Sequence, residues 1–405
     1  MTIGTAGRRN ALILSLCQGL FTGAISIDLT LTGLTGYQLA PNKALATLPF
    51  AMITVSGAVV TFFASLLMAR IGRRAGFMLG AASATLGGAV SVWAVLHDAF
   101  WIFCLGTAFV GVFQAFAQYY RLAAADSVPA DAKSRAISTV LAGGVIAAVL
   151  GPALAAWSKD LIPTALFAGS YLMVCALGLA SLLALFFYRD LADAPLAAGA
   201  AASPPRPLGT ILRTPVFVAS AANSIAGAAV MLFVMTAAPL AAVACGHAID
   251  DGANIIQWHL VGMFAPSFIT GTLIKRCGLP AVLYAGMALN VACVVTALAS
   301  TSLPAFYAAL FCLGVGWNFM FTGGTTLLTL ACEPAEKARV QGIAELMRNG
   351  ASALATLGAG SVLDFYGWSV VNLAILPLLA LSAAVTLWWA ASERRARARA
   401  RLAAA

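Results

Sequence analysis

The chain has 405 residues, of which 61% are hydrophobic and 9% are charged, and its formal net charge is +9. A soluble domain carries about 25% charged residues, so the composition excludes a water-soluble globule and predicts an integral membrane protein. About 20 consecutive apolar residues span one hydrocarbon core, and this length identifies the candidate membrane spans.

Twelve apolar stretches are long enough to cross a bilayer. They cover residues 10–36, 46–69, 76–97, 100–121, 135–157, 163–188, 215–240, 252–274, 279–300, 304–331, 340–363 and 368–391. The first follows Arg8 and Arg9, as a secretory signal would, but its apolar run exceeds the 7–15 residues of a signal core. We therefore predict an uncleaved first helix.

Basic residues are distributed unequally between the two sides of these spans. If the N-terminus is cytoplasmic, only Lys43 and Lys159 of the 23 Lys and Arg residues lie on the opposite side, and Arg348 falls within a span. This follows the positive-inside rule and predicts both termini in the cytoplasm. The positive charge is interpreted as topological, and no nucleic-acid partner is expected.

Two short patterns recur at nearly the same offset. Residues 65–74 read "SLLMARIGRR" after the second span, and residues 271–278 read "GTLIKRCG" after the eighth. Likewise "PADAKSRA" (129–136) follows the fourth span and "PAEKARV" (334–340) follows the tenth. A duplicated six-helix unit is a known transporter architecture. The predicted division is a bundle over 1–188, an Ala/Pro-rich linker over 189–213, a bundle over 214–392 and a basic tail over 393–405.

These patterns resemble the major facilitator superfamily of transporters along the whole chain. Its signature turn, Gly-x-x-x-Asp-Arg-x-Gly-Arg-Arg, corresponds here to Ser65, Ala69, Arg70, Gly72, Arg73 and Arg74, with Ala replacing the acid. The weaker second copy keeps Gly271, Arg276 and Gly278. The resemblance implies a cytoplasmic gate, although arginines that only fix the topology are an alternative. Small residues at 65 and 271 would let helices approach closely, and Gly72 and Gly278 would adopt angles that other residues resist.

The resemblance implies an all-α protein of twelve transmembrane helices in two pseudo-symmetric six-helix bundles, placed in the bacterial inner membrane. The string "AAVLGPALAAW" is similar to the Gly-x-x-x-Gly-Pro stretch of antiporters and predicts a helix kink at Gly151 and Pro152. The strings "IIQWHLVGMFAPSFITG", "GVGWNFMFTGG" and "ARVQG" resemble a bacterial subgroup of small-solute carriers that includes riboflavin carriers.

Polar and ionisable side chains inside the predicted spans are candidates for function, because such groups are costly in lipid. Gln114, Gln118 and Arg121 are spaced to share one helix face. The candidates for a substrate cavity are Gln18, Asp28, Gln114, Gln118, Tyr119, Arg121, Asn223, Gln257, Trp258, His259, Trp317 and Asn318. The alternatives are hydrogen bonds between packed helices and, for Asp28, a wet vestibule.

Four residues are candidates for ion coupling: Asp28, His259, Glu345 and Arg348. Histidine titrates near neutrality when unperturbed, and a carboxyl group inside a bundle can exchange a proton. Glu345 and Arg348 can instead neutralise each other at a spacing of three.

The sequence lacks His-Glu-x-x-His, Gly-x-Ser-x-Gly and phosphate-loop motifs, and its eight cysteines form no Cys-x-x-Cys. We therefore expect neither an enzyme nor a bound metal, disulfide or cofactor. The predicted function is secondary active transport of a small solute by a monomer, by alternating access and with proton coupling. A sensor or assembly protein that does not transport is the alternative. For the substrate, uptake of a riboflavin-like planar solute and efflux of a drug or metabolite both stay open.

Overall fold

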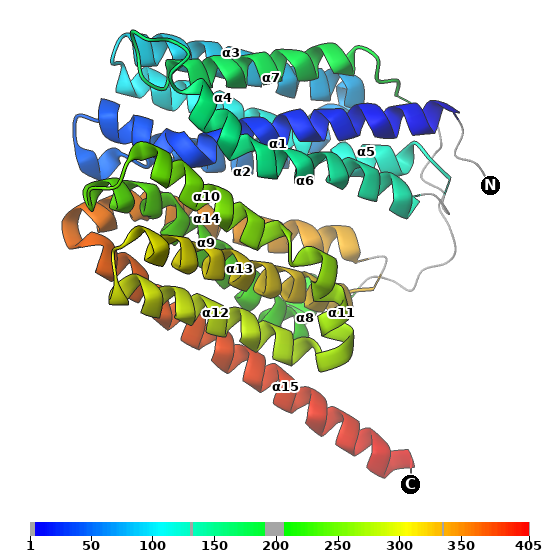
Figure 1. Cartoon of the computed structure of the whole chain (residues 1–405). Helices are drawn as coiled ribbons and strands as arrows, with labels where there is room; N and C mark the ends of the chain where they lie inside the picture. Colours follow the sequence, from blue (N-terminus) through cyan, green and yellow to red (C-terminus); the bar gives the residue numbers. More distant parts are fainter. Residues whose placement is uncertain (1–4, 130–132, 191–205, 334–335, 405) are drawn as a thin grey trace. The chain divides into compact units, whose positions relative to one another are not determined.

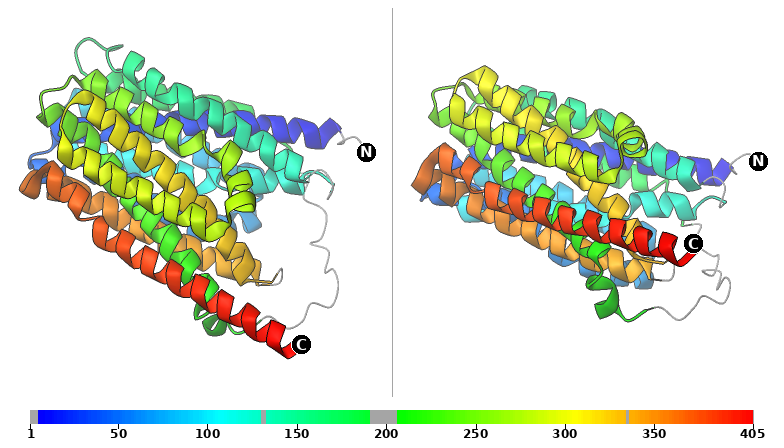
Figure 2. Two further views of the ribbon diagram at one scale, coloured as in Figure 1. Left: turned by 60° about the horizontal axis from the view of Figure 1, so that its bottom comes forward. Right: turned by 90° about the horizontal axis from the view of Figure 1, so that it is seen from below.

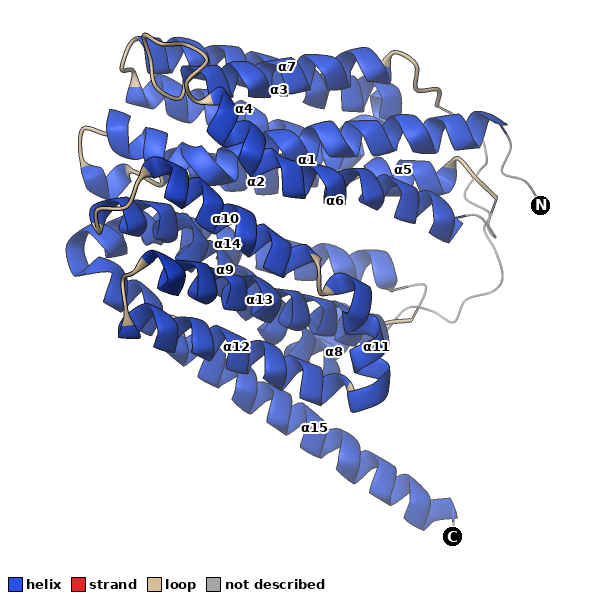
Figure 3. Cartoon of the chain, viewed as in Figure 1, coloured by secondary structure: helices blue, strands red, loops and turns tan. Residues whose placement is uncertain are grey.

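The computed structural model describes residues 5–129, 133–190, 206–333 and 336–404 (Figure 1). Within these ranges the chain is helical and contains no strand, as Figure 3 shows. This confirms the predicted all-α fold. The chain divides into two compact units, of which the first comprises Met1–Ala198 and Ala242–Gln257 and the second Gly199–Ala241 and Trp258–Ala405.

The first unit is built from the N-terminal helices. They are α1 (Thr5–Leu39), the short 3-10 helix η1 (Lys43–Leu45), α2 (Leu48–Ile71), α3 (Arg73–Leu96), α4 (Phe100–Ala117), α5 (Tyr120–Asp126), α6 (Lys133–Ser158) and α7 (Ala168–Leu185).

The second unit is built from the C-terminal helices. They are α8 (Leu208–Leu212), α9 (Pro215–Ala244), α10 (Ile249–Phe264), α11 (Ser267–Cys277), α12 (Leu279–Ala299), α13 (Leu303–Ala331), α14 (Lys337–Leu373) and α15 (Leu376–Ala404). The end of α9 and the start of α10 belong to the first unit.

Nine helices in the described part of the chain are long and apolar enough to cross a membrane. The predicted number of twelve spans stays a prediction. Two predicted spans are interrupted: residues 100–121 break at Gln118 and Tyr119 into α4 and α5, and residues 252–274 break at Ala265 and Pro266 into α10 and α11. Proline has no backbone N–H to continue the ladder, which accounts for the second break.

The boundary predicted between the last two spans, residues 364–367, coincides with a break in the backbone. Within α14 the chain leaves the helical conformation at Gly367, where φ is 79° and ψ is 176°. Helix α15 runs unbroken through the predicted basic tail, and both views in Figure 2 follow it to its C-terminal end. Arg394 and Arg395 therefore lie on a continuous helix and are exposed.

Small residues allow the helices of the first unit to pack closely. A Cβ atom on Gly143 of α6 would lie 2.1 Å from the backbone oxygen of Ser15 in α1, and one on Gly151 would lie 2.2 Å from the Ser26 side chain. Larger side chains at these positions would separate the two helices. In lipid, where apolar burial does not drive helices together, such close van der Waals contact holds a bundle.

An ion-pair cluster links the start of α10 to the other helices of the first unit. The Lys159 ammonium lies 2.6 Å from the Asp160 carboxylate and 3.3 Å from that of Asp250, and the lysine side chain is 12% exposed. The hydrogen bond to Asp160, with Asp250 beside it, holds the pKa of Lys159 above its ordinary value. The cluster thus ties the loop after α6 to the start of α10.

Candidate functional site

The turn between α2 and α3 gathers two acidic residues around the signature motif. Gly72 ends α2 with φ 83° and ψ 157°. The backbone N–H of Arg73 then donates to Asp190 Oδ2 at 2.8 Å, and the Arg73 guanidinium lies 2.6 Å from Asp126 Oδ2. Two acids thus contact the turn that lacks one at position 69: Asp126 at the end of α5 and Asp190 in the segment that follows α7. Sequence spacing alone gave no signal for either of them.

The other arginines of this turn differ in their contacts. Arg74 donates to the backbone oxygen of Phe186 at 2.8 Å, which satisfies a carbonyl at the C-terminal end of α7. Arg70 is exposed. The side chain of Ser65 lies outside the described residues. Because exposed ion pairs contribute about 0–1 kcal/mol, this cluster orients the turn more than it stabilises the fold.

The second copy of the motif reproduces the backbone of the first and little else. Gly278 joins α11 to α12 with φ 86° and ψ 154°, and Arg276 is exposed. The expectation that Gly271 lets helices approach closely is wrong for this structure. A Cβ atom there would meet nothing within 4 Å, because Gly271 lies on an exposed part of α11.

Asp28 lies in the interior of the first unit with 0% of its surface exposed. Its Oδ1 accepts a hydrogen bond from Thr32 at 3.0 Å, and Tyr171 of α7 lies within 3.3 Å of the Thr32 hydroxyl and 3.0 Å of the Thr35 hydroxyl. Oδ2 has no partner among the described residues. A buried polar atom without a partner is costly, so this half-satisfied carboxyl group is a strong candidate for function. Because Asp28 is fully buried, this structure does not support the alternative that Asp28 lies in a wet vestibule.

The predicted polar face of the fourth span is only partly brought together. Gln114 and Gln118 are half-buried, Tyr119 donates to the Thr61 backbone oxygen at 3.3 Å, and Arg121 is exposed. The tightened turn at residues 118–119 displaces Arg121 from the ideal spacing. On α1, Gln18 bonds Thr22 at 3.2 Å within its own helix.

Two asparagines predicted for the cavity fasten helices together instead. Asn318 of α13 accepts from Thr270, and its amide nitrogen donates to the Met263 oxygen and the Ser267 hydroxyl, both at 2.7 Å. It therefore supports the break at Pro266. Asn223 of α9 donates to Thr386 of α15 at 2.9 Å. The packing alternative describes both better than ligand binding does.

The three consecutive polar residues of α10 point in different directions. Gln257 is half-buried, Trp258 is 54% exposed and His259 is 0% exposed. His259 Nδ1 lies 2.8 Å from the Leu310 backbone oxygen, which can only accept, so Nδ1 carries the proton. This contact gives His259 a structural role that joins α10 to α13.

The kink predicted at Gly151 and Pro152 does not interrupt α6. The helix is continuous from Lys133 to Ser158, Gly151 packs against Ser26 of α1, and the side chain of Pro152 lies outside the described residues. Another proline, Pro239, which was not among the predicted kink residues, lies inside α9.

An aromatic and charged array lies on α13 and α14 of the second unit. The Trp317 and Phe321 rings stack at a centroid distance of 4.9 Å and an angle of 11°. The Arg348 guanidinium carbon is 5.7 Å from the Phe321 centroid, and Arg348 forms an ion pair with Glu345. All four side chains are half-buried, which leaves the array accessible. Phe321, which follows Trp317 by one helical turn, was missed because phenylalanine in an apolar helix carries no polar signal.

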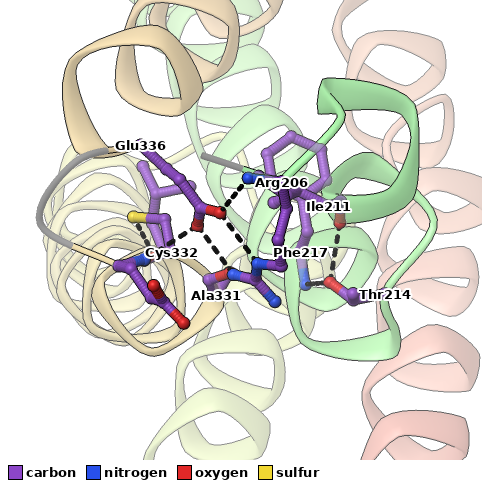
Figure 4. A network of polar contacts seen from close by, with 9 residues as sticks. Arg206, Ile211, Thr214, Phe217, Ala331, Cys332 and Glu336 are labelled. Atoms are coloured by element: carbon purple, nitrogen blue, oxygen red, sulfur yellow. Dashed lines mark hydrogen bonds and ion pairs between the residues drawn. The ribbon is translucent and has the colours of Figure 1, made fainter. Parts of the chain in front are cut away.

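The C-terminal part of the predicted linker is anchored to the α13–α14 junction, as Figure 4 shows. Both guanidinium nitrogens that face Glu336 bond its carboxylate, at 2.8 and 2.7 Å, and the backbone N–H of Arg206 donates to it at 2.9 Å. Arg206 also donates to the Ala331 oxygen at 3.2 Å. Of the predicted linker, residues 191–205 lie outside the described residues, and α8 occupies part of its C-terminal end.

Comparison with known proteins gives consistent matches. A family model described as Major Facilitator Superfamily matches residues 11–256 and 252–405. The chain is 41% identical over 384 residues to the riboflavin transporter RfnT of Brucella anthropi, a match that covers 94% of this chain and 96% of that protein. It is 26% identical over 387 residues to the uncharacterized MFS-type transporter YddS of Bacillus subtilis, with 91% and 88% coverage.

The fold is also similar to that of a solved transporter structure. The crystal structure of a bacterial homolog to the human lysosomal transporter Spinster, in an inward-facing and occupied conformation, matches with a TM-score of 0.68. The two chains are 14% identical, and the match covers 94% of this chain and 96% of that one. At this identity the similarity concerns the fold alone.

Proposed function

The chain belongs to the Major Facilitator Superfamily, and on this premise we propose that it carries a planar, riboflavin-like solute across a bacterial inner membrane by alternating access. Its relative at 41% identity is named as a riboflavin transporter over nearly the whole length of both chains. This supports a related substrate. Proton coupling through Asp28 is part of the proposal.

The array of Trp317, Phe321, Arg348 and Glu345 is the observation that carries the substrate class. Two parallel, half-buried rings offer a stacking surface for a flat heteroaromatic solute. The Trp317 ring N–H is buried without a partner in the described part of the chain, so a state of the transport cycle that exposes it would offer a donor for a solute carbonyl. The Arg348–Glu345 pair supplies donors and acceptors at the edge of the array. A few polar groups beside aromatic surface are typical of small-molecule sites.

Asp28 supports the coupling step. Its carboxyl group is fully buried, and it forms no ion pair with any described Lys, Arg or His. A charge in such surroundings is costly unless a proton or a donor compensates it. If Asp28 is wet in one state and buried in the other, proton binding favours one state over the other, and a pH gradient then drives the cycle.

The proposed substrate class can be tested with purified protein and riboflavin. Stacking quenches riboflavin fluorescence, so titration gives a Kd directly. Trp317→Ala is expected to weaken binding by about tenfold, the upper end for one aromatic pair. Trp101→Ala is the matched control, because Trp101 is 64% exposed on α4 of the first unit. Wild-type protein that neither binds riboflavin nor exchanges it in proteoliposomes would overturn the proposal, as would equal Kd values for Trp317→Ala and wild type.

A further inference from the structure

A groove of about 610 Å³ lies between the start of α1 and the end of α7, within the first unit. Its lining has two parts. Arg8 and Arg9 form one end, and the remainder is apolar: Leu12, Ile13, Leu16, Ala184 and Phe187. No residue proposed above for transport takes part in it.

The helical spacing places the charges and the apolar residues in order along one face of α1. Leu12 and Leu16 follow Arg8 at intervals of four, so the three side chains form a stripe. At 1.5 Å per residue the stripe extends about 12 Å from Arg8 to Leu16. Leu12 and Leu16 are each 56% exposed, and Phe187 is 63% exposed. The groove thus presents a cationic mouth and an apolar channel that continues into the predicted hydrocarbon region.

The mouth of the groove is held in place by hydrogen bonds. Arg9 donates to the backbone oxygen of Phe187 at 3.2 Å, and Asn10 donates to that of Arg189 at 2.8 Å. The end of α7 is therefore fixed to α1. Arg8 is exposed and forms no ion pair with any acid in the described ranges. Its charge is free to bind an anion.

We propose that this groove binds an anionic phospholipid, with the phosphate at Arg8 and Arg9 and an acyl chain along Leu12, Ile13 and Leu16. Arginine presents several donors that match phosphate oxygens, and basic residues at the membrane surface attract anionic lipid. The apolar channel excludes a hydrophilic phosphate compound as the preferred occupant, because such a compound would leave the exposed leucines uncovered. A zwitterionic lipid lacks the net charge that two arginines complement.

The test uses the full-length protein in detergent and its apparent melting temperature as a function of added lipid. Dioleoylphosphatidylglycerol is expected to raise the melting temperature saturably, because a ligand of the native state stabilises it by mass action. Dioleoylphosphatidylcholine tests the charge, and glycerol 3-phosphate tests the need for an acyl chain. Both are expected to give much smaller shifts.

Variants locate the site. Arg8→Gln with Arg9→Gln is expected to raise the half-saturating phosphatidylglycerol concentration by about thirtyfold. Ala184→Trp fills the channel while keeping both charges, and it is expected to abolish the saturable shift. Arg394→Gln with Arg395→Gln is the matched control, because these exposed arginines lie on α15. Comparing the two lipids within each variant removes any change in basal stability. Equal shifts for the two lipids, or a wild-type response in the Arg8/Arg9 variant, would overturn the proposal.

Discussion

Gly72 and Gly278 lie 206 positions apart and hold nearly the same backbone conformation, with φ/ψ of 83°/157° and 86°/154°. Each joins the helix that ends before it to the helix that starts after it. This region of backbone space is essentially restricted to glycine. The shared conformation supports the predicted duplication of a six-helix unit, since a merely basic turn would have no reason to repeat it.

Replacing either glycine by alanine is expected to destabilise the protein. Strain at such angles costs about 1–3 kcal/mol, so both Gly72→Ala and Gly278→Ala should lower the melting temperature. Gly72→Ala should have the larger effect, because its Cβ would lie 3.3 Å from Asp190 Oδ2 whereas the nearest atom to one on Gly278 is at 3.9 Å. Thermal unfolding in detergent measures the difference.

Gly271→Ala is the control for this pair. Gly271 lies within α11 with open space around it, and alanine is the better helix former by about 0.5–1 kcal/mol. The expected change is therefore a small stabilisation. A melting temperature that falls equally in all three variants would show that the φ values do not matter.

The fold was largely predictable because its signals are long-range averages. Apolar stretches of about 20 residues and the asymmetry of basic residues do not depend on any one contact. Local breaks were harder. Pro266 offered a signal for the break between α10 and α11, but the turn at Gln118 and Tyr119 carries neither proline nor glycine.

The site was less predictable, because polar residues in lipid are used for structure as well as for function. Asn318 and His259 look functional in the sequence. In the structure, however, Asn318 donates to the backbone oxygen of Met263 and His259 to that of Leu310, each on a neighbouring helix. Those contacts depend on which helices pack together. The contacts of Asp126 and Asp190 with the turn after α2 were not predicted for the same reason. These two acids are separated by 64 residues in the chain.

Asn318→Ala is accordingly expected to act on stability. It removes two donated hydrogen bonds at 2.7 Å and the acceptor for Thr270, and leaving the buried Met263 oxygen and Thr270 hydroxyl unpaired costs about 1–3 kcal/mol each. The melting temperature should fall, while the Kd for riboflavin of the folded protein should stay near the wild-type value. A large loss of affinity with unchanged stability would instead return Asn318 to the binding site.

Arg206 and Glu336 are expected to act as one unit. Arg206→Gln and Glu336→Gln should each lower the melting temperature, and the double variant should resemble the more affected single variant because the interaction is shared. Glu336 is 2% exposed because Arg206 covers it, although it lies near the surface of the unit. Additive losses in the double variant would show that the two residues contribute independently.

The same pair predicts a pH dependence. The hydrogen bonds from Arg206 lower the pKa of Glu336 from 4.5 to about 2. Because the pKa of Glu336 is lower in the folded protein than in the unfolded chain, the pair contributes its full stabilisation of the fold above about pH 4.5. The contribution decreases as the pH falls below about 4.5 and is lost below about 2. The difference in melting temperature between wild type and Glu336→Gln should thus be constant from pH 6 to 8 and should shrink only as the pH falls below about 4.5.

The proposed coupling role of Asp28 gives the sharpest expectation for transport. Asp28→Asn imitates the protonated carboxyl group and keeps an acceptor for Thr32, whose hydroxyl lies 3.0 Å from Oδ1. The variant should bind the solute and exchange it across proteoliposomes, since exchange needs no net proton movement. It should fail to accumulate solute under an imposed pH gradient, so that the ratio of internal to external solute stays near unity. Asp98→Asn, at an exposed turn after α3, should accumulate like wild type. Normal accumulation by Asp28→Asn would leave Asp28 as a buried structural acid and would move the search for the coupling group to Glu345, which forms an ion pair with Arg348.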